Sequence, residues 1–151
     1  MTTKNMSEID LMVSEIIQTY KSEKQRQFGE NKQRLITALR STPILSVRIG
    51  FDGSGDEGYV HPPEAFGDGD APCEIPDIEI ECLSYTNAET IALKLTAAVE
   101  SLAEHYLEDN HGGWEFEEGA YGEFRVDVPN GAVTLEYNER FIDTTYSEVT
   151  F

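Results

Sequence analysis

The sequence is short of cysteine, of long apolar runs and, after residue 40, of basic residues. Its two cysteines, Cys73 and Cys82, are too few for a disulfide scaffold, so we expect two reduced thiols. Neither the cysteines nor the three histidines have the C-x-x-C or H-x-x-x-H spacing that is typical of a zinc site. No apolar run is long enough to cross a bilayer, and the start of the chain is polar, with no secretory leader. We therefore expect a cytoplasmic protein that does not contact membranes.

The shortage of basic residues is confined to the part of the chain after residue 40. Residues 1–40 contain seven basic and five acidic residues, whereas the remaining residues contain four basic and twenty-four acidic ones, a net charge of −20. A body this acidic repels phosphate groups and anionic lipids, which excludes direct binding to nucleic acid or to a membrane surface. Its attractive partners are basic protein surfaces and cations.

What the sequence does contain is a long amphipathic pattern near its start. Ser7 and Asp10 form a capping-box signature, and apolar residues then recur at helical spacing up to Leu39. This pattern predicts a helix over residues 8–40.

The length of this helix sets its relation to the rest of the chain. It would extend about 50 Å at 1.5 Å per residue, against a radius of gyration of about 15 Å for a domain of this size. Two alternatives are open: the helix kinks near Gly29, or its first half projects and packs on another chain. We divide the chain into an N-terminal helix at residues 1–41 and an acidic α+β domain at residues 42–151.

Strand-like alternation organises the remainder of the chain around a second helix. Thr86 and Glu89 form another capping-box signature, ahead of an apolar helical face. The order of elements is typical of the α+β class, with a mostly antiparallel sheet of five or six strands and both helices packed on one face. The predicted elements are strands over 45–51 and 75–85, loops over 52–58 and 61–72, a helix over about 87–110, strands over 114–117, 123–128 and 133–138, and a further edge strand within 141–151.

The stretch from His111 to Val128 holds the only tryptophan and is predicted to form the central hairpin of the sheet. Its alternation divides it between two faces. The apolar residues, which we expect to pack against the second helix, are Trp114, Phe116, Phe124 and Val126. The opposite, solvent-exposed face of the sheet is predicted to carry the negative charge through Glu79, Glu115, Glu117, Glu123, Asp127 and Glu136.

Several motifs of this chain resemble a known family. The segments HGGWE, GAYGEF and NER, together with DGSGDEG after the first strand, resemble an uncharacterised family of small bacterial and phage proteins, catalogued as domain of unknown function 6878. The resemblance covers roughly residues 44–151 and leaves out the N-terminal helix and the GDGDAP segment. It implies an acidic α+β domain encoded in bacterial genomes, plasmids and prophages, and it assigns no activity and no catalytic residue.

The loop after the first strand is a candidate cation site. Asp52, Ser54 and Asp56 occupy positions 1, 3 and 5, as oxygen ligands do at the start of a calcium loop. The pattern then departs from a calcium loop, because position 6 is Glu57 instead of glycine and position 12 is Pro63 instead of glutamate. The competing interpretation is a glycine-rich turn whose aspartates accept backbone hydrogen bonds. A module that binds calcium or magnesium at this loop is our second hypothesis on function.

The first hypothesis is a non-enzymatic protein-interaction module. Carboxylates crowded on one face repel one another, and a basic surface on a partner protein would relieve that repulsion. Such a module would act as an inhibitor or accessory factor in a phage–host conflict, or as a decoy that mimics nucleic acid. The candidate partner-binding residues are Asp52, Asp56, Glu57, Glu115, Glu117, Glu123, Asp127 and Glu136.

Two further hypotheses stay open. A carboxylate-dependent hydrolase would use Glu123 and Glu136, and it requires a concave pocket around them. The N-terminal helix would join copies of the chain into a homo-oligomer or bind another protein. The residues assign no catalytic group and no cofactor.

Overall fold

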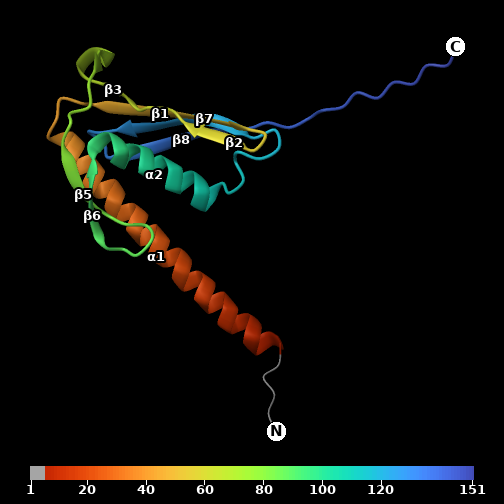
Figure 1. The fold of residues 1–151 in the computed structure, drawn as a ribbon, viewed down its shortest axis with the longest axis horizontal. Helices are drawn as coiled ribbons and strands as arrows, with labels where there is room; N and C mark the ends of the chain where they lie inside the picture. The colour runs from red at the N-terminus through yellow and green to blue at the C-terminus, as the bar shows by residue number, and fades with distance from the viewer. Residues whose placement is uncertain (1–5) are drawn as a thin grey trace, which may run out of the picture.

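The structure is a computed structural model that describes residues 6–151. An antiparallel sheet forms one layer and two helices form the other (Figure 1), which confirms the predicted α+β class. In chain order the elements are α1 (Met6–Arg40), β1 (Ser46–Ser54), β2 (Glu57–Val60), β3 (Glu64–Phe66), η1 (Asp68–Asp70), β4 (Pro72–Cys73), β5 (Glu79–Leu83), β6 (Thr90–Lys94), α2 (Leu95–Asn110), β7 (Ala120–Asp127) and β8 (Ala132–Glu139).

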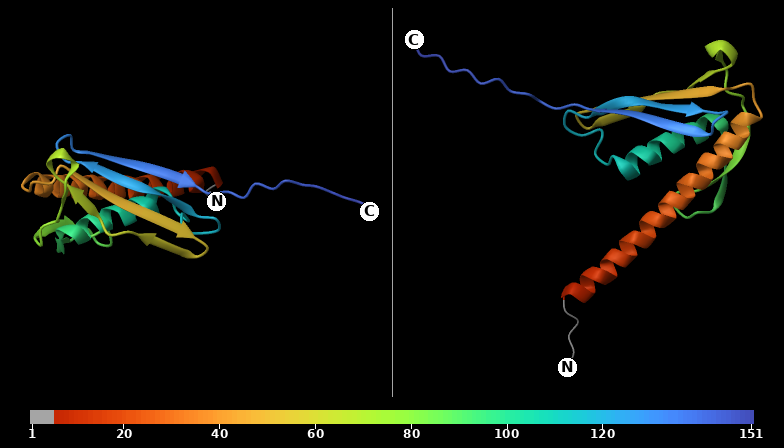
Figure 2. Two further views of the ribbon diagram at one scale, coloured as in Figure 1. Left: turned by 90° about the horizontal axis from the view of Figure 1, so that it is seen from above. Right: turned by 180° about the vertical axis from the view of Figure 1, so that it is seen from behind.

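The main sheet has six strands in the order β4-β3-β1-β7-β8, with β2 paired to the second half of β1. All neighbouring strands are antiparallel. Strands β5 and β6 form a separate two-stranded sheet that lies beside α1 (Figure 2). Both helices lie on the same side of the main sheet, which leaves its other face, called the outer face below, open to solvent.

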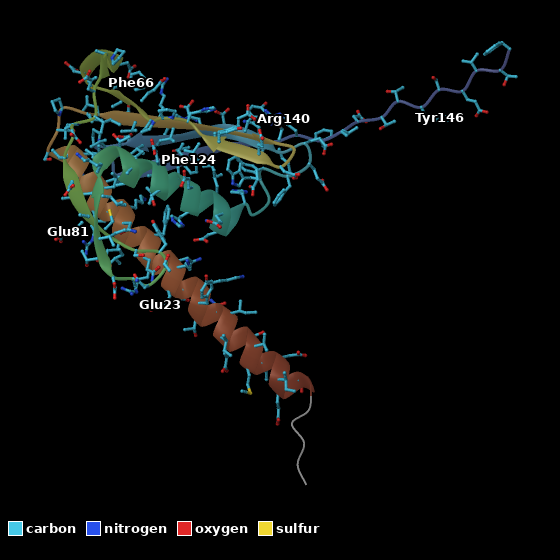
Figure 3. The ribbon with its side chains drawn as sticks, viewed as in Figure 1. Glu23, Phe66, Glu81, Phe124, Arg140 and Tyr146 are labelled. Atoms are coloured by element: carbon cyan, nitrogen blue, oxygen red, sulfur yellow. The ribbon has the colours of Figure 1, made fainter. Side chains whose placement is uncertain are left out.

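The core lies between the main sheet and the two helices. Because successive residues of a strand point to opposite faces, alternate side chains of β1 and β7 are buried and their neighbours face outward. Figure 3 shows Phe124 between the sheet and α2. The most fully buried side chains are Leu35, Ile36, Leu39, Ile44, Val47, Ile49, Phe51, Leu95, Val99, Leu107 and Val126.

Helix α1 is continuous over 35 residues and passes through Gly29 without a break. The residues around this glycine are mostly strong helix formers, which offset its low helix propensity. The helix ends where the hydroxyl groups of Ser41 and Thr42 donate to carbonyl oxygens of its last turn, just before Pro43. Of the two alternatives, the helix does not kink near Gly29, and its first half projects beyond the body of the molecule (Figure 1). Despite its length, neither α1 nor any other helix within residues 6–151 is apolar enough to cross a membrane.

The second half of α1 covers the open edge of β5. Three of its side chains donate to backbone carbonyls at alternating positions along this edge and just beyond it. An unpaired strand edge is a template for pairing with other chains, so these bonds protect it. The donors and their acceptors are Arg34 to Glu81, Asn31 to Leu83 and Lys24 to Tyr85.

We expect the variant Asn31→Ala to be less stable than the native chain by about 2 kcal/mol. The buried Asn31 side chain donates from Nδ2 to the carbonyl of Leu83 at 2.9 Å and accepts from the N–H of Leu83 at 2.7 Å. Alanine leaves both backbone groups without these bonds. Urea unfolding followed by circular dichroism measures the change, and Gln33→Ala, at an exposed position of the same helix, is the control. Equal stability of the two variants would contradict this role of Asn31.

The helix predicted to start at residue 87 is wrong over its first two turns, since α2 starts at Leu95. Residues 90–94 form β6 instead, and they pair with β5 along its whole length. Ala88 has a left-handed backbone, with φ 60°, which makes a turn where the capping box was predicted. Pairing with another strand therefore overrides the local helical pattern.

Two further predicted strands do not form. Residues 114–117 lie in a series of turns, because the backbone has positive φ at Gly113, Glu117 and Gly119, a conformation that a strand excludes. Residues 141–151 are an exposed, extended tail that pairs with no strand within the described part of the chain (Figure 1).

The two predicted loops are more ordered than the sequence indicates. Residues 52–58 form the end of the β1–β2 hairpin. Residues 61–72 contain β3 and the single 3₁₀ turn η1. The short strands β3 and β4 complete the sheet on one side of β1, so the proline-rich segment belongs to the sheet edge.

Candidate functional site

The β1–β2 hairpin and the loop between α2 and β7 pack against each other at one end of the main sheet. The hairpin closes with a tight two-residue turn. The N–H of Gly55 in this turn donates to the carbonyl of Glu117 in the loop, at 2.8 Å. Residues 52–58 and 111–119, with residues 139–140 at the end of β8, make up the structure called the tip below.

Trp114 connects the tip to the core. Its ring lies edge-on to Phe51, with the ring centroids 5.6 Å apart. A Cβ at Gly53 would lie 2.9 Å from this ring and one at Gly58 would lie 2.7 Å from it, so only glycine lets the hairpin approach so closely. The predicted burial of Trp114 is confirmed in part, because its side chain is half-buried. The prediction is wrong for Phe116, which is 53% exposed and does not share the buried face.

Arg140 links the β1–β2 hairpin to the end of β8 through hydrogen bonds. Its guanidinium donates to the Asp52 carboxylate and to the Gly53 carbonyl, both at 3.0 Å, and it lies 4.5 Å from the centre of the Tyr121 ring. Its backbone N–H donates to the carbonyl of Gly119. Figure 3 shows Arg140 where the C-terminal tail leaves the sheet. No local signal in the sequence points to this role, since the side-chain bonds join residues 87 and 88 positions apart.

The tip gathers carboxylates from three segments of the chain. Seven of them lie on it, against one basic residue, Arg140. Five belong to the partner-binding residues predicted from the sequence. The other two are Glu118, which follows Glu117 in the loop, and Glu139, which was missed because its proximity depends on the return of β8 beside the loop. The seven are Asp52, Asp56, Glu57, Glu115, Glu117, Glu118 and Glu139.

The pKa values of two tyrosines reflect the negative charge at this end of the molecule. Burial raises the pKa of Tyr137 above its usual value, and the carboxylates of Glu139 and Glu115 raise it further because they disfavour a second negative charge nearby. The hydroxyl of Tyr59 donates to Glu57 at 2.9 Å, and this hydrogen bond, with the charge of the same carboxylate, raises the pKa of Tyr59. Both hydroxyls therefore stay protonated to a higher pH than in a free tyrosine.

Exposed aromatic side chains lie among these carboxylates. Phe116 lies in the loop of the tip, and Tyr59 and Tyr121 flank Asp52 in the register across β2, β1 and β7. All three rings are exposed. Because aromatic residues are enriched among the residues that dominate binding at protein interfaces, the tip combines charge with apolar contact area.

The outer face of the main sheet is less acidic than the sequence predicts. Arg48 and Arg125 lie opposite each other on β1 and β7, and Arg48 is 3.7 Å from the carboxylate of Glu123. The prediction fails for residues 114–117, which do not form the predicted strand, and for β5, which belongs to the two-stranded sheet and not to the main sheet. Of the six carboxylates predicted for this face, Glu123, Asp127 and Glu136 lie on it, whereas Glu79 lies on the β5–β6 sheet and Glu115 and Glu117 lie in the loop before β7.

The candidate cation ligands Asp52, Ser54 and Asp56 lie on the β1–β2 hairpin. One of them is already engaged, since Asp52 accepts a hydrogen bond from Arg140. Within residues 6–151, no three His, Cys, Asp or Glu side chains are grouped as ligands of a metal ion. Cation binding at this hairpin stays a prediction.

The candidate hydrolase pair, Glu123 and Glu136, lies on the outer face, where the two residues are directly opposite each other on β7 and β8. A hollow on this face is lined by Arg48, Arg125 and Asp127 among others, and it does not include either glutamate. Hydrolysis at this pair also stays a prediction.

An antiparallel sheet backed by two helices, with a carboxylate-rich tip at one end, defines this chain as an acidic α+β domain. The sequence model of a family of unknown function, DUF6878, matches residues 27–151. The chain belongs to this family. The match starts earlier than the resemblance at residues 44–151 indicates, so the shared domain includes the second half of α1 and the GDGDAP segment. No curated protein and no solved structure matches the sequence.

Proposed function

We propose that the chain is a non-enzymatic protein-interaction module whose tip binds a basic surface of a partner protein. The observation that carries this proposal is the gathering of seven carboxylates around one arginine at the tip, in a chain of net charge −18. Like charges held this close repel one another, and a basic partner surface removes that repulsion. A cytoplasmic setting is part of the proposal, since Cys73 and Cys82 are free thiols and the cytoplasm keeps thiols reduced.

The tip is ordered before any partner binds. Trp114 packs under the hairpin, and Arg140 joins the hairpin to β8. A surface that is already ordered loses little conformational entropy on binding, which favours affinity for a given contact area. These contacts therefore support a role for the tip as a preformed binding surface.

The exposed aromatic rings support a protein as the partner. Tyr59, Phe116 and Tyr121 offer apolar area next to the carboxylates. A hydrated metal ion gains nothing from this area, whereas the cores of protein interfaces are enriched in aromatic residues. A basic protein surface thus accounts for both the charge and the aromatic side chains.

A variant with three neutralised carboxylates tests the proposal. The changes Asp56→Asn, Glu57→Gln and Glu117→Gln remove exposed charges and leave the backbone contacts of the tip unaltered. The immobilised native chain first retains basic proteins from a cell extract, and a purified retained protein then serves as the probe in titration calorimetry. We expect the tip variant to bind this probe about tenfold or more weakly, and we expect rising salt to weaken binding by the native chain.

The control variant carries the same change in net charge away from the tip. It has the changes Glu74→Gln, Glu79→Gln and Glu81→Gln, at exposed positions on or just before β5, and it should bind the probe as the native chain does. Equal weakening of both variants would show attraction to the overall charge and would contradict a site at the tip. Binding that does not change with salt would contradict it as well. Circular dichroism and Trp114 fluorescence confirm that both variants are folded.

A further inference from the structure

The projecting half of α1 exposes a row of apolar side chains. A contiguous apolar surface of this kind marks a contact with another molecule, because isolated apolar side chains on a surface do not align in this way. Ile16, at the centre of the row, is 68% exposed. The members of the row, called the apolar stripe below, are Ile9, Met12, Val13, Ile16, Ile17 and Tyr20.

The stripe has the width of a contact face for one helix. At 3.6 residues per turn its members span about 140° of the helix circumference, and the apolar face of a packed helix spans about 100° or more. Within residues 7–24, Leu11 is the one large apolar residue outside the stripe. It lies on the opposite side of the helix and is 65% exposed, so it provides a reference position for experiments.

The stripe is symmetric along the helix axis. Its centre lies midway between Ser14 and Glu15. A second copy of α1 that runs antiparallel, with a two-fold axis through this midpoint, places every stripe residue level with a stripe residue of the other copy. An unrelated partner helix does not require this symmetry. The residues at equal distances from the midpoint are Ile9 and Tyr20, Met12 and Ile17, and Val13 and Ile16.

The charges of the projecting half favour the antiparallel direction. Residues 7–15 contain three acidic and no basic residues, whereas residues 21–26 contain three basic residues and one acidic residue. In the symmetric register an antiparallel pair brings Lys21 of each copy beside the acidic part of the other, whereas a parallel pair would place the two acidic parts side by side; it also opposes the two helix dipoles. In the symmetric register, Asp10 of one copy and Lys21 of the second copy lie on the same flank, about 3 Å apart along the axis.

The stripe leads into a hollow between α1 and the end of α2. Ile16, Ile17 and Tyr20 line its outer part, and Phe28 and Tyr106 line its inner part. Phe28 and Tyr106 also line an apolar cavity of about 170 Å³ beneath the sheet. In the symmetric register the N-terminal end of the second α1 lies beside Tyr20. The hollow therefore receives this N-terminal end, and the apolar contact between the two copies extends into the hollow.

From the width, the symmetry and the charge of the stripe, we infer that the chain forms a two-fold dimer through antiparallel pairing of residues 9–20 of α1. This interface lies outside residues 27–151, the part of the chain that the family model matches. It also shares no residue with the tip, so the dimer and the proposed partner binding stand or fall independently.

Sedimentation equilibrium of the full chain tests the dimer. We expect Ile16→Glu to raise the dissociation constant about a hundredfold or more, because each dimer contains the change twice and each change places a charge in an apolar contact. Leu11→Glu is the matched control, since it makes the same kind of change at an equally exposed position on the opposite side of α1, and it should leave the constant unchanged. A monomeric native chain, a different stoichiometry or equal effects of the two variants would each overturn the inference.

An exchange of charges tests the antiparallel register. The single changes Asp10→Lys and Lys21→Glu each place like charges on the same flank of the dimer at two symmetric positions, and we expect each to weaken it about tenfold. The double variant Asp10→Lys/Lys21→Glu restores opposite charges with their positions exchanged, so it should recover the native constant. Circular dichroism verifies the helix content of all three. A double variant no tighter than the single ones would rule out this register.

Discussion

Replacement of Phe51 by alanine is expected to lower the free energy of unfolding by about 4 kcal/mol, because it leaves a cavity and removes contacts at a fully buried aromatic position. Phe51 is 2% exposed, and its ring lies 5.6 to 6.0 Å from the rings of Trp114, Phe124 and Tyr137. It therefore joins the core beneath the sheet to the tip. Urea unfolding followed by circular dichroism measures the loss.

The single tryptophan makes this prediction specific to the tip. Loss of the Phe51 ring exposes the edge of Trp114, so its emission should shift to the red even in the folded variant. Phe116→Ala is the matched control, since it removes the same side chain from an exposed position, and it should change stability by less than about 0.5 kcal/mol. Similar losses for Phe51→Ala and Phe116→Ala would contradict the central position of Phe51.

Three strands of the main sheet can be predicted from the sequence because each has one buried and one exposed face. These strands are β1, β7 and β8. In all three the apolar residues alternate with polar ones; those within β1 and β7 are buried and those of β8 are half-buried, whereas Leu45, just before β1, is exposed. Such alternation is a local signal, since every second residue of a strand points the same way whatever the neighbouring strand is. These strands with the two helices are enough to define the fold class.

The errors arise where contacts with another segment decide the conformation. Residues 90–94 are compatible with a helix, and it is their alignment with β5 that makes them a strand. Residues 114–117 alternate like a strand, but Trp114 is fixed under the β1–β2 hairpin and Glu117 takes a positive φ to meet it. The hairpin is far from residues 114–117 in sequence, whereas β5 is separated from β6 only by residues 84–89. In both cases the contact that decides the conformation does not show in the pattern of the segment itself.

The candidate site was predictable in its composition and not in its geometry. The excess of acidic residues and most of the carboxylates of the tip are evident in the sequence. Their gathering depends on the packing of residues 52–58 against residues 111–119, and on Arg140, whose bonds reach back to Asp52 and Gly53. The outer face likewise carries fewer carboxylates than predicted, because Glu79 lies on the other sheet and Glu115 and Glu117 lie in the loop before β7.

The tip lies at one end of the main sheet, and the projecting half of α1 points away from the sheet (Figure 1). A dimer built through α1 would therefore leave both tips free, and it would present two of them at once. Two linked sites bind a partner with two basic surfaces more tightly than one site does, because the second contact forms at a high effective concentration. The dimer would in this way strengthen the proposed partner binding without a change in the tip.

Residues 52–58 and 111–119 pack closely against each other in the tip, and the contact is tightest at Gly119. A Cβ at this position would lie 1.7 Å from the carbonyl oxygen of Gly53 and 2.9 Å from the Cα of Ser54. Both are backbone atoms, which cannot move aside as a flexible side chain can. Gly119 also has a φ of +72°, which is unfavourable for any residue with a side chain.

We therefore expect Gly119→Ala to lower the free energy of unfolding by about 3 kcal/mol or more, and to part the hairpin from the loop beneath it. Gly55→Ala separates the two causes, because Gly55 has a similar φ of +64° and nothing within 4 Å of an added Cβ, so it should cost only about 1 kcal/mol. Urea unfolding gives both values. In the folded variants, Trp114 fluorescence should change for Gly119→Ala and not for Gly55→Ala, since only the first forces the hairpin away from the tryptophan. Equal costs for the two variants would mean that backbone strain alone acts at Gly119 and that the two segments of the tip are not in close contact.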